Sequence, residues 1–334
     1  MRLERAIEKF LYGYFATRDL SEKTYKAYAG DLRQLLAYFG QKARLRALRS
    51  GDIELFIRHL RTSGYATTSI RRKIATLKLF FSYWLRKKKI ALTPFRELQI
   101  KIPPSTSNKV KNISAADIDK LYAQAHANYN GAPLLRYGKI DRKYLALRDW
   151  ALLDLLFTTG LRVSEALSLQ HFEIMEGDPY LRVIGKGNRP RIAFIAAPAS
   201  LNLQGEHLQH RKGLRDVATT KLFLNYRGEG LSPHGVTYLL KRLAAQGSLE
   251  CDISPHRLRH SVATLLLANG EDIRIVQTFL GHASIRTTQR YTHLNKDQVL
   301  TRLAETHPSA KMPSFALDNR RLCKALLFDT PIGR

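Results

Sequence analysis

Residues 159–167 read TGLRVSEAL, and they follow an apolar helical pattern that runs from Tyr144 to Thr158. Gly160 supplies the turn at which that helix ends, and Arg162 stands near the start of a new amphipathic helix. Helix N-termini favour anions, and a guanidinium there adds a bidentate fork. Glu165, three residues on, can pair with Arg162 and orient it, although most pairs at this spacing are plain surface pairs. The stretch predicts an anion site between two helices.

Downstream, the sequence predicts a β-hairpin with strands at residues 180–184 and 191–195. The turn at residues 185–190 reads GKGNRP, so it is rich in glycine and cations. Lys186 at its tip can reach a phosphate beside a DNA groove, whereas the turn taken alone is more typical of a solvated lysine.

Residues 254–260, SPHRLRH, predict a further helix with Ser254 as its cap and Pro255 in its first turn. His256 and Arg259 share one face, which places a proton donor beside a phosphate-binding guanidinium. His260 lies four residues after His256, a spacing that also suits zinc. We expect no metal, because Cys251 alone cannot complete the ligand set.

Residues 280–293 read LGHASIRTTQRYTH. A helix ends at Gly281, His282 follows, and Ser284 caps a helix that carries Tyr291. A tyrosine in such a position is usually a packed ring. Its hydroxyl has an ordinary pKa of about 10 and becomes a nucleophile only beside activating groups such as cations.

The 334 residues carry a net charge of +27, and most of it lies in the N-terminal third. Residues 1–112 contain 25 Lys and Arg against 8 Asp and Glu, a net charge of +17, and residues 113–334 carry +10. This excess favours a polyanionic partner, first of all DNA, over a merely cationic surface. The hydrophobic fraction of 44% excludes a disordered chain.

Four short amphipathic helices are predicted in that basic third, at residues 4–16, 21–39, 52–64 and 67–89. Such helices form a small bundle, and its outer cations can neutralise phosphates without reading the DNA sequence. The candidates for this grip on DNA are Arg71, Arg72, Lys73, Lys78, Lys87, Lys88 and Lys89.

Prolines and a polar run, STSNK at residues 105–109, interrupt the helical pattern after the bundle. We expect a first domain at residues 1–91 and an extended linker at 92–112. A second domain at 113–311 then begins with a helix capped by Ser114 and Asp117, and 312–334 form a C-terminal extension.

The composition also indicates a compartment. Cys251 and Cys323 are too few for a disulfide framework, and no apolar run is long enough to span a membrane. Charged residues interrupt the N-terminus, so we expect no signal peptide. The expectation is a soluble cytoplasmic protein without a membrane partner.

In their order and spacing, these segments resemble the signature of the tyrosine recombinase, or phage integrase, family, most of all its bacterial Xer branch. The likeness covers about residues 5–310, including THPSAK at 306–311. It implies a mainly α-helical fold with a small β-sheet, in which a four-helix, SAM-like core-binding bundle and a catalytic domain form a C-shaped clamp. The matching residues are Arg162, Lys186, His256, Arg259, His282 and Tyr291.

The resemblance implies site-specific DNA strand exchange through a 3′-phosphotyrosyl intermediate, with no metal and no other cofactor. Tyr291 would be the nucleophile, while Arg162 and Arg259 would hold the scissile phosphate. Glu165 would orient the arginine and histidine groups.

The same resemblance assigns the remaining roles and the partners. Lys186 would protonate the departing 5′-oxygen, His256 would assist proton transfer, and His282 would hydrogen-bond the phosphate. Four protomers on two DNA duplexes, each with a specific recombination site, would form the working homo-oligomer.

Two departures from the compact Xer pattern leave the biological role open: an insertion at residues 124–143 and about 23 residues after THPSAK. Integration, excision, dimer resolution and transposition stay open, as does the need for a partner recombinase or an accessory protein. A type IB topoisomerase-like enzyme is disfavoured by the bundle and the Xer-like ending. A non-catalytic DNA-binding protein is disfavoured by the complete catalytic set.

A short apolar face follows Tyr291. It either docks on its own domain or packs on a neighbouring protomer, and the sequence favours neither. Its residues are Val299, Leu300, Leu303 and Ala304.

Overall fold

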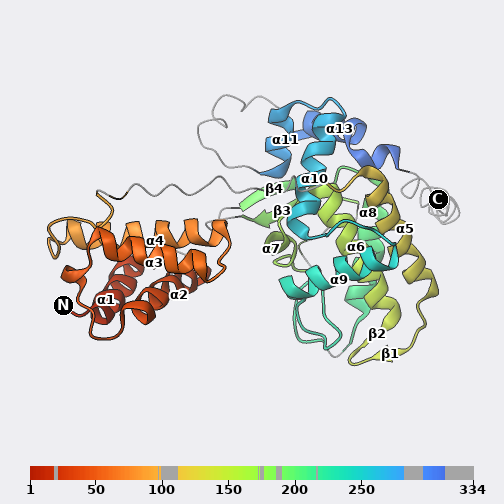
Figure 1. Cartoon of the computed structure of the whole chain (residues 1–334). Helices are drawn as coiled ribbons and strands as arrows, with labels where there is room; N and C mark the ends of the chain where they lie inside the picture. The colour runs from red at the N-terminus through yellow and green to blue at the C-terminus, as the bar shows by residue number, and fades with distance from the viewer. Residues whose placement is uncertain are drawn as a thin grey trace, which may run out of the picture. The chain divides into compact units, whose positions relative to one another are not determined.

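The computed structural model describes residues 1–18, 22–96, 98, 112–171, 173, 177–185, 190–215, 217–281 and 296–312 (Figure 1). The chain divides into two compact units, Met1–Val110 and Lys111–Arg334. Both are mainly helical, and the described residues of the second also form two small antiparallel sheets of two strands each. The predicted fold class, a helical bundle followed by a larger helical domain with little sheet, is confirmed.

The first unit contains α1 (Leu3–Ala16), α2 (Glu22–Phe39), the short η1 (Leu45–Ala47), α3 (Ser50–Thr62) and α4 (Thr67–Arg86). Its core is aromatic where α1 meets α4: the rings of Phe10 and Phe80 lie edge to face with centroids 5.4 Å apart. Leu32, Leu35 and Phe56 are also buried. Tyr25 of α2 is 41% exposed and contacts Phe15 by a ring edge.

Lys73 departs from the expected outward-facing cations of α4. It is only 5% exposed, and its Nζ lies 3.0 Å from Oδ1 of Asp31 on α2. The same carboxylate accepts hydrogen bonds from Nη1 of Arg72 at 2.8 Å and from Thr76 at 2.9 Å. The prediction that Lys73 belongs to an outer phosphate-gripping face is therefore wrong, because a buried Asp31 on the facing helix pairs with it. Lys78, Lys87, Lys88 and Lys89 are exposed, Arg72 is about half exposed, and Arg71 is partly buried.

The second unit is built around α6 (Arg142–Thr159), in which every residue from Leu147 to Thr159 is buried. A helix that is covered on all sides forms the centre of a domain. The helices packed on α6 are α5 (Ala115–Gly131), α8 (Pro198–Gly213) and α10 (Pro255–Ala268). Next to them, α9 (Pro233–Gln246) packs on α5 and α10, and α11 (Ile273–Leu280) packs on α10. The predicted capping box of Ser114 and Asp117 starts α5.

Asp154, a buried carboxylate on α6, ties three of these helices together. It accepts hydrogen bonds from Tyr122 of α5 at 3.0 Å, and from Ser200 and Gln204 of α8 at 2.7 and 2.8 Å. Buried polar groups stabilise a fold only when they are satisfied in this way. The network fixes α6, and with it the loop that follows α6.

The insertion at residues 124–143 contains the end of α5 and a small hairpin of β1 (Arg136–Tyr137) and β2 (Ile140–Asp141). The hairpin packs on the turn around Tyr226, whose carbonyl accepts a hydrogen bond from the amide of Lys139 at 3.1 Å. Gly138 turns the hairpin with φ of 70°, and a Cβ there would lie 2.5 Å from that carbonyl oxygen.

The apolar face near the C-terminus lies on α13 (Lys296–Thr306), which is followed by η2 (Pro308–Lys311). Val299 and Leu303 are 2% and 0% exposed and belong to the core of their own unit. Glu271, at the start of the α10–α11 connection, accepts hydrogen bonds from Arg302 and Thr306 of α13. Of the two alternatives left open by the sequence, the structure shows docking on the same domain.

No helix within the described ranges is long and apolar enough to cross a membrane. Cys251 is a free, partly buried thiol, and Cys323 lies outside the described residues.

His207 of α8 is a fully buried histidine that packs against α6. Its ring stacks between those of Tyr144 and Phe223, with centroids 5.6 and 5.1 Å away. Burial, reinforced by the positive charges of Arg148 and Arg211, lowers the pKa of His207 to about 3. The folded state therefore holds this imidazole neutral, whereas the unfolded chain titrates near its ordinary 6.5.

We expect His207→Leu to flatten the acid dependence of folding. The pKa of His207 is lower in the folded protein than in the unfolded chain, so the unfolded chain binds a proton first as the pH falls. The free energy of unfolding is therefore highest above about pH 6.5 and falls toward pH 3 by up to about 1.4 kcal/mol per pH unit. Urea unfolding of the second unit, followed by Trp150 fluorescence in a Trp84→Phe background, measures this slope. His234→Gln removes an exposed histidine from α9 and should leave the slope as it is. Equal slopes in wild type and His207→Leu would contradict the assignment.

Candidate active site

The candidate site begins where α6 ends. Gly160 adopts a left-handed conformation with φ of 57° and stops the helix. A Cβ at this position would lie 2.7 Å from Cδ2 of Leu280, so the close approach of α11 also requires glycine. Arg162 then serves as the N-cap of α7 (Val163–Ala166). The predicted amphipathic helix is a single turn, and Leu167 and Ser168 follow it as a hydrogen-bonded turn, so a helix dipole adds little to the site.

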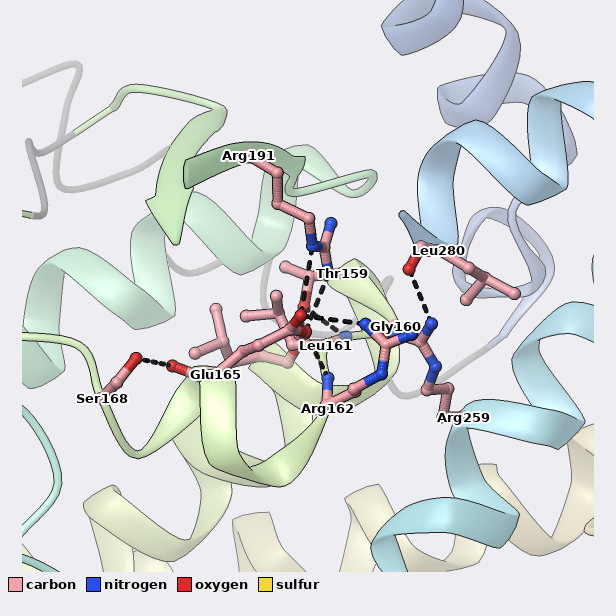
Figure 2. Close-up of polar contacts among 10 residues, drawn as sticks. Thr159, Gly160, Leu161, Arg162, Glu165, Ser168, Arg191, Arg259 and Leu280 are labelled. Carbon is pink, nitrogen blue, oxygen red and sulfur yellow. Dashed lines mark hydrogen bonds and ion pairs between the residues drawn. The ribbon is translucent and has the colours of Figure 1, made fainter. Parts of the chain in front are cut away.

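Glu165 is the centre of the polar contacts in this loop (Figure 2). Its side chain is only 3% exposed, whereas that of Arg162 is 41% exposed. Oε1 accepts a hydrogen bond from Nη1 of Arg162 at 3.0 Å, and Oε2 accepts one from the backbone amide of Arg162 at 2.8 Å. The structure therefore forms the pair that the sequence spacing suggested, and it holds the arginine by both its side chain and its backbone.

Arg191 is a participant that sequence reasoning missed. It lies on β4 (Pro190–Phe194), which pairs with β3 (Tyr180–Ile184) in the predicted hairpin. Its Nε and Nη2 donate to the two oxygens of Glu165 at 3.3 and 2.9 Å. The GKGNRPR run contains this arginine, but nothing in its spacing links it to a glutamate 26 residues earlier.

The carboxyl of Glu165 stays ionised in this environment. Burial alone would raise its pKa, but the hydrogen bonds and charges of Arg191 and Arg162 outweigh that effect, so its pKa lies below the ordinary value. A charged Glu165 can therefore hold both guanidinium groups across the neutral pH range.

Arg259 approaches the same loop from α10, which Ser254 caps and Pro255 opens as predicted. Arg259 is only 7% exposed. Its guanidinium donates one hydrogen bond to the carbonyl oxygen of Gly160 and another, at 2.6 Å, to that of Leu280. Burial and the nearby charge of Arg162 lower the pKa of Arg259 to about 10, so the group remains a cation at neutral pH. Arg259 thereby joins the end of α6 to the end of α11.

Figure 2 shows the guanidinium groups of Arg162 and Arg259 next to each other beside Gly160. Two like charges at close range repel, and an anion between them relieves that repulsion. Three arginines and one glutamate give this cluster a formal charge of +2. Such a site suits a phosphate group that gains negative charge during a reaction.

The other predicted site residues are placed only in part. His256 lies one helical turn before Arg259 on α10 and is exposed. His260 is exposed as well, and no three His, Cys, Asp or Glu side chains are grouped to hold a metal ion within the described part of the chain. Lys186, His282 and Tyr291 lie outside the described residues.

Comparison with known proteins identifies this arrangement. Residues 111–298 match the phage integrase family, and residues 7–88 match the N-terminal SAM-like domain of phage integrases. The chain belongs to the phage integrase family of tyrosine recombinases. It is a site-specific tyrosine recombinase, an enzyme that cuts and rejoins DNA strands.

The similarity to curated recombinases extends over nearly the whole chain. Tyrosine recombinase XerD of Listeria monocytogenes is 35% identical over 309 residues, which cover 91% of this chain and 99% of that protein. Tyrosine recombinase XerC of Staphylococcus aureus is 30% identical over 305 residues, 91% of this chain and 97% of that protein. The Xer-like character predicted from the motifs is confirmed.

Solved structures share the fold of this recombinase. The XerH recombinase bound to its palindromic difH substrate matches 88% of this chain and 82% of that chain, with a TM-score of 0.63 at 23% identity. The Tn1549 transposon integrase in complex with circular intermediate DNA matches 90% and 98%, with a TM-score of 0.66 at 17% identity.

Proposed function

We propose that this recombinase cleaves DNA with Tyr291 as nucleophile and with Arg162 and Arg259 as the clamp on the scissile phosphate. The observation that carries the proposal is the convergence of these two arginines, one held by Glu165 and the other by the carbonyls of Gly160 and Leu280. Neither arginine is free to swing away, so the site is organised before DNA arrives.

In the proposed step, the Tyr291 oxygen forms a bond to phosphorus while the bond from phosphorus to the 5′-oxygen breaks. Lys186 gives its proton to the departing oxygen, His256 assists proton transfer by accepting the proton that the Tyr291 hydroxyl loses, and His282 hydrogen-bonds the phosphate. The phosphotyrosyl bond conserves the energy of the phosphodiester. A 5′-hydroxyl from a second duplex can therefore reverse the step and complete strand exchange, and the chain needs no cofactor for it.

The proposed assembly follows from the family and from the charge distribution. Lambda integrase has been solved as a dimer bound to a core site, and XerH has been solved bound to its difH substrate. We infer two protomers on each duplex and four in the recombining complex. Residues 1–91 and 113–311 would close on the duplex as a clamp joined by residues 92–112. The exposed cations Arg72, Lys78, Lys87, Lys88 and Lys89 would grip phosphates.

Similarity to XerD and XerC is compatible with dimer resolution in the cytoplasm on the nucleoid as one candidate role, with integration or transposition as the second candidate. The second candidate is favoured by the insertion at residues 124–143 and by the extension beyond residue 311. Either role is compatible with a partner recombinase or an accessory protein.

A plasmid assay tests the proposal. A duplex site is first obtained by in vitro selection with the full chain, and two copies are then placed on a supercoiled plasmid. We expect complexes of two protomers per site and four per synapse by mass photometry, together with a crossover product. Tyr291→Phe should assemble equally and yield no product. Crossover by Tyr291→Phe, or relaxation without crossover by wild type, would contradict the proposal.

A further inference from the structure

Arg191 uses the same two oxygens of Glu165 that hold Arg162. Oε1 receives Nη1 of Arg162 at 3.0 Å and Nε of Arg191 at 3.3 Å, and Oε2 receives the Arg162 amide at 2.8 Å and Nη2 of Arg191 at 2.9 Å. The Arg191 side chain is 15% exposed, against 41% for Arg162. The more buried arginine is thus the permanent partner of the carboxylate, and the more exposed one faces solvent.

The same guanidinium packs against the end of α11. A Cβ built on Gly281 would lie 2.7 Å from Cδ, Nε and Cζ of Arg191, and Gly281 has φ of 65°. Arg191 opposes Val183 in the β3–β4 ladder, so the strand pairing fixes its backbone. One side chain therefore connects β4, α7 and the end of α11 (Figure 2 shows Arg191 above Glu165, with Leu280 across the site).

Nη1 of Arg191 is buried and has no hydrogen-bond partner among the described residues. A buried donor without an acceptor costs free energy. The bonds from Nε and Nη2 to Glu165 nevertheless fix the position of this guanidinium.

The charges of Glu165 and Arg191 explain how their contact affects Arg162. A buried carboxylate bonded to one arginine would hold that arginine strongly, because the pair has little competition from water. Arg162 would then be neutralised by Glu165 and would have less attraction for a phosphate. A second cation on the same carboxylate divides its charge and leaves Arg162 with net positive potential toward an anion.

We propose that Arg191 is a positioning residue for strand cleavage: it binds Glu165 so that Arg162 stays oriented by the carboxylate and available to the scissile phosphate. The inference rests on the proposed function, in which Arg162 contacts that phosphate. Arg191 touches no reacting atom and acts through Glu165.

Single-turnover cleavage of two substrates tests this role. One duplex carries the natural scissile phosphodiester, and the other carries a methylphosphonate, which has one negative charge fewer and needs less cationic stabilisation. We expect Arg191→Gln to cleave the phosphodiester about 10²-fold more slowly than wild type and the methylphosphonate less than about tenfold more slowly. Arg191→Lys should recover part of the loss on the phosphodiester. Arg182→Gln removes an exposed arginine from the same hairpin and should match wild type on both substrates.

If Arg191 had only a structural role, Arg191→Gln would slow the cleavage of both substrates by the same factor, and that result would overturn the inference. If Arg191→Gln folds poorly, the double variant Glu165→Gln with Arg191→Gln removes the carboxylate that would neutralise Arg162, and it should cleave faster than Arg191→Gln alone. A slower double variant would also contradict the proposal. The same two substrates, cleaved by Arg162→Ala, distinguish the failure of this inference from the failure of the proposed function. If Arg162→Ala slows both substrates equally, the proposed contact between Arg162 and the scissile phosphate is wrong. If Arg162→Ala slows the phosphodiester more and Arg191→Gln does not, only the role of Arg191 is wrong.

Discussion

Replacing Arg162 with alanine is expected to lower the rate of strand cleavage by about 10²–10³-fold while DNA affinity stays nearly unchanged. The side chain is 41% exposed and makes its described hydrogen bonds only with Glu165. Arg191 remains on that carboxylate in the variant, so no buried charge is left unpaired and the fold should persist. Single-turnover cleavage and fluorescence anisotropy, measured on the same duplex, give the two quantities.

Lys87→Ala is the matched control for this variant. Lys87 is an exposed cation just after α4, within residues 1–112, which carry a net charge of +17. If it contacts a phosphate, its loss should weaken binding and reduce the salt dependence of affinity by about 0.9 in the log–log slope. The single-turnover rate at saturating enzyme should not change. Equal effects of both variants on affinity and on rate would contradict the division of the positive charge into grip and catalysis.

Arg259→Lys should be nearly as damaging, by about 10²-fold in cleavage rate, although it conserves the charge. The planar guanidinium bonds two carbonyl oxygens at once, those of Gly160 and Leu280, and a lysine ammonium lacks that fork. The end of α6 and the end of α11 would then lose their common tie. We therefore also expect a lower melting temperature of the second unit.

Arg274→Lys makes the same chemical change at an exposed position of α11 and should leave cleavage and melting as in wild type. Cleavage by Arg259→Lys within about threefold of wild type would show that charge alone suffices and that the fork at this position is dispensable.

Local signals in the sequence were enough to predict much of this fold. Helical spacing located α1 to α4, the apolar run located α6, and alternation with a glycine turn located β3 and β4. Capping residues placed the starts of α5 and α10, because Ser114 and Ser254 bond amides only three residues away. The pair of Arg162 and Glu165 was also within reach, since both residues sit in one turn.

The remaining features depend on contacts between distant segments. Arg191 reaches Glu165 across 26 positions, and Lys73 reaches Asp31 across 42, so no helical or strand period reveals either pair. The sequence predicted an exposed Lys73, because a lysine on a helix is usually solvated. No local pattern indicated that a buried Asp31 would pair with it. Arg259 was predicted as a phosphate ligand, but its two carbonyl contacts require the folded ends of α6 and α11.

The central claim is that this recombinase forms a covalent bond to DNA through Tyr291. A selected duplex with a nick beside the cleavage position loses a short fragment after cleavage and traps the intermediate. We expect a protein–DNA adduct whose proteolytic peptide, identified by mass spectrometry, carries the nucleotide on Tyr291. The adduct should be absent with Tyr291→Phe and strongly reduced with Arg162→Ala. A nucleotide attached to another residue, or an adduct that persists in Tyr291→Phe, would contradict the account.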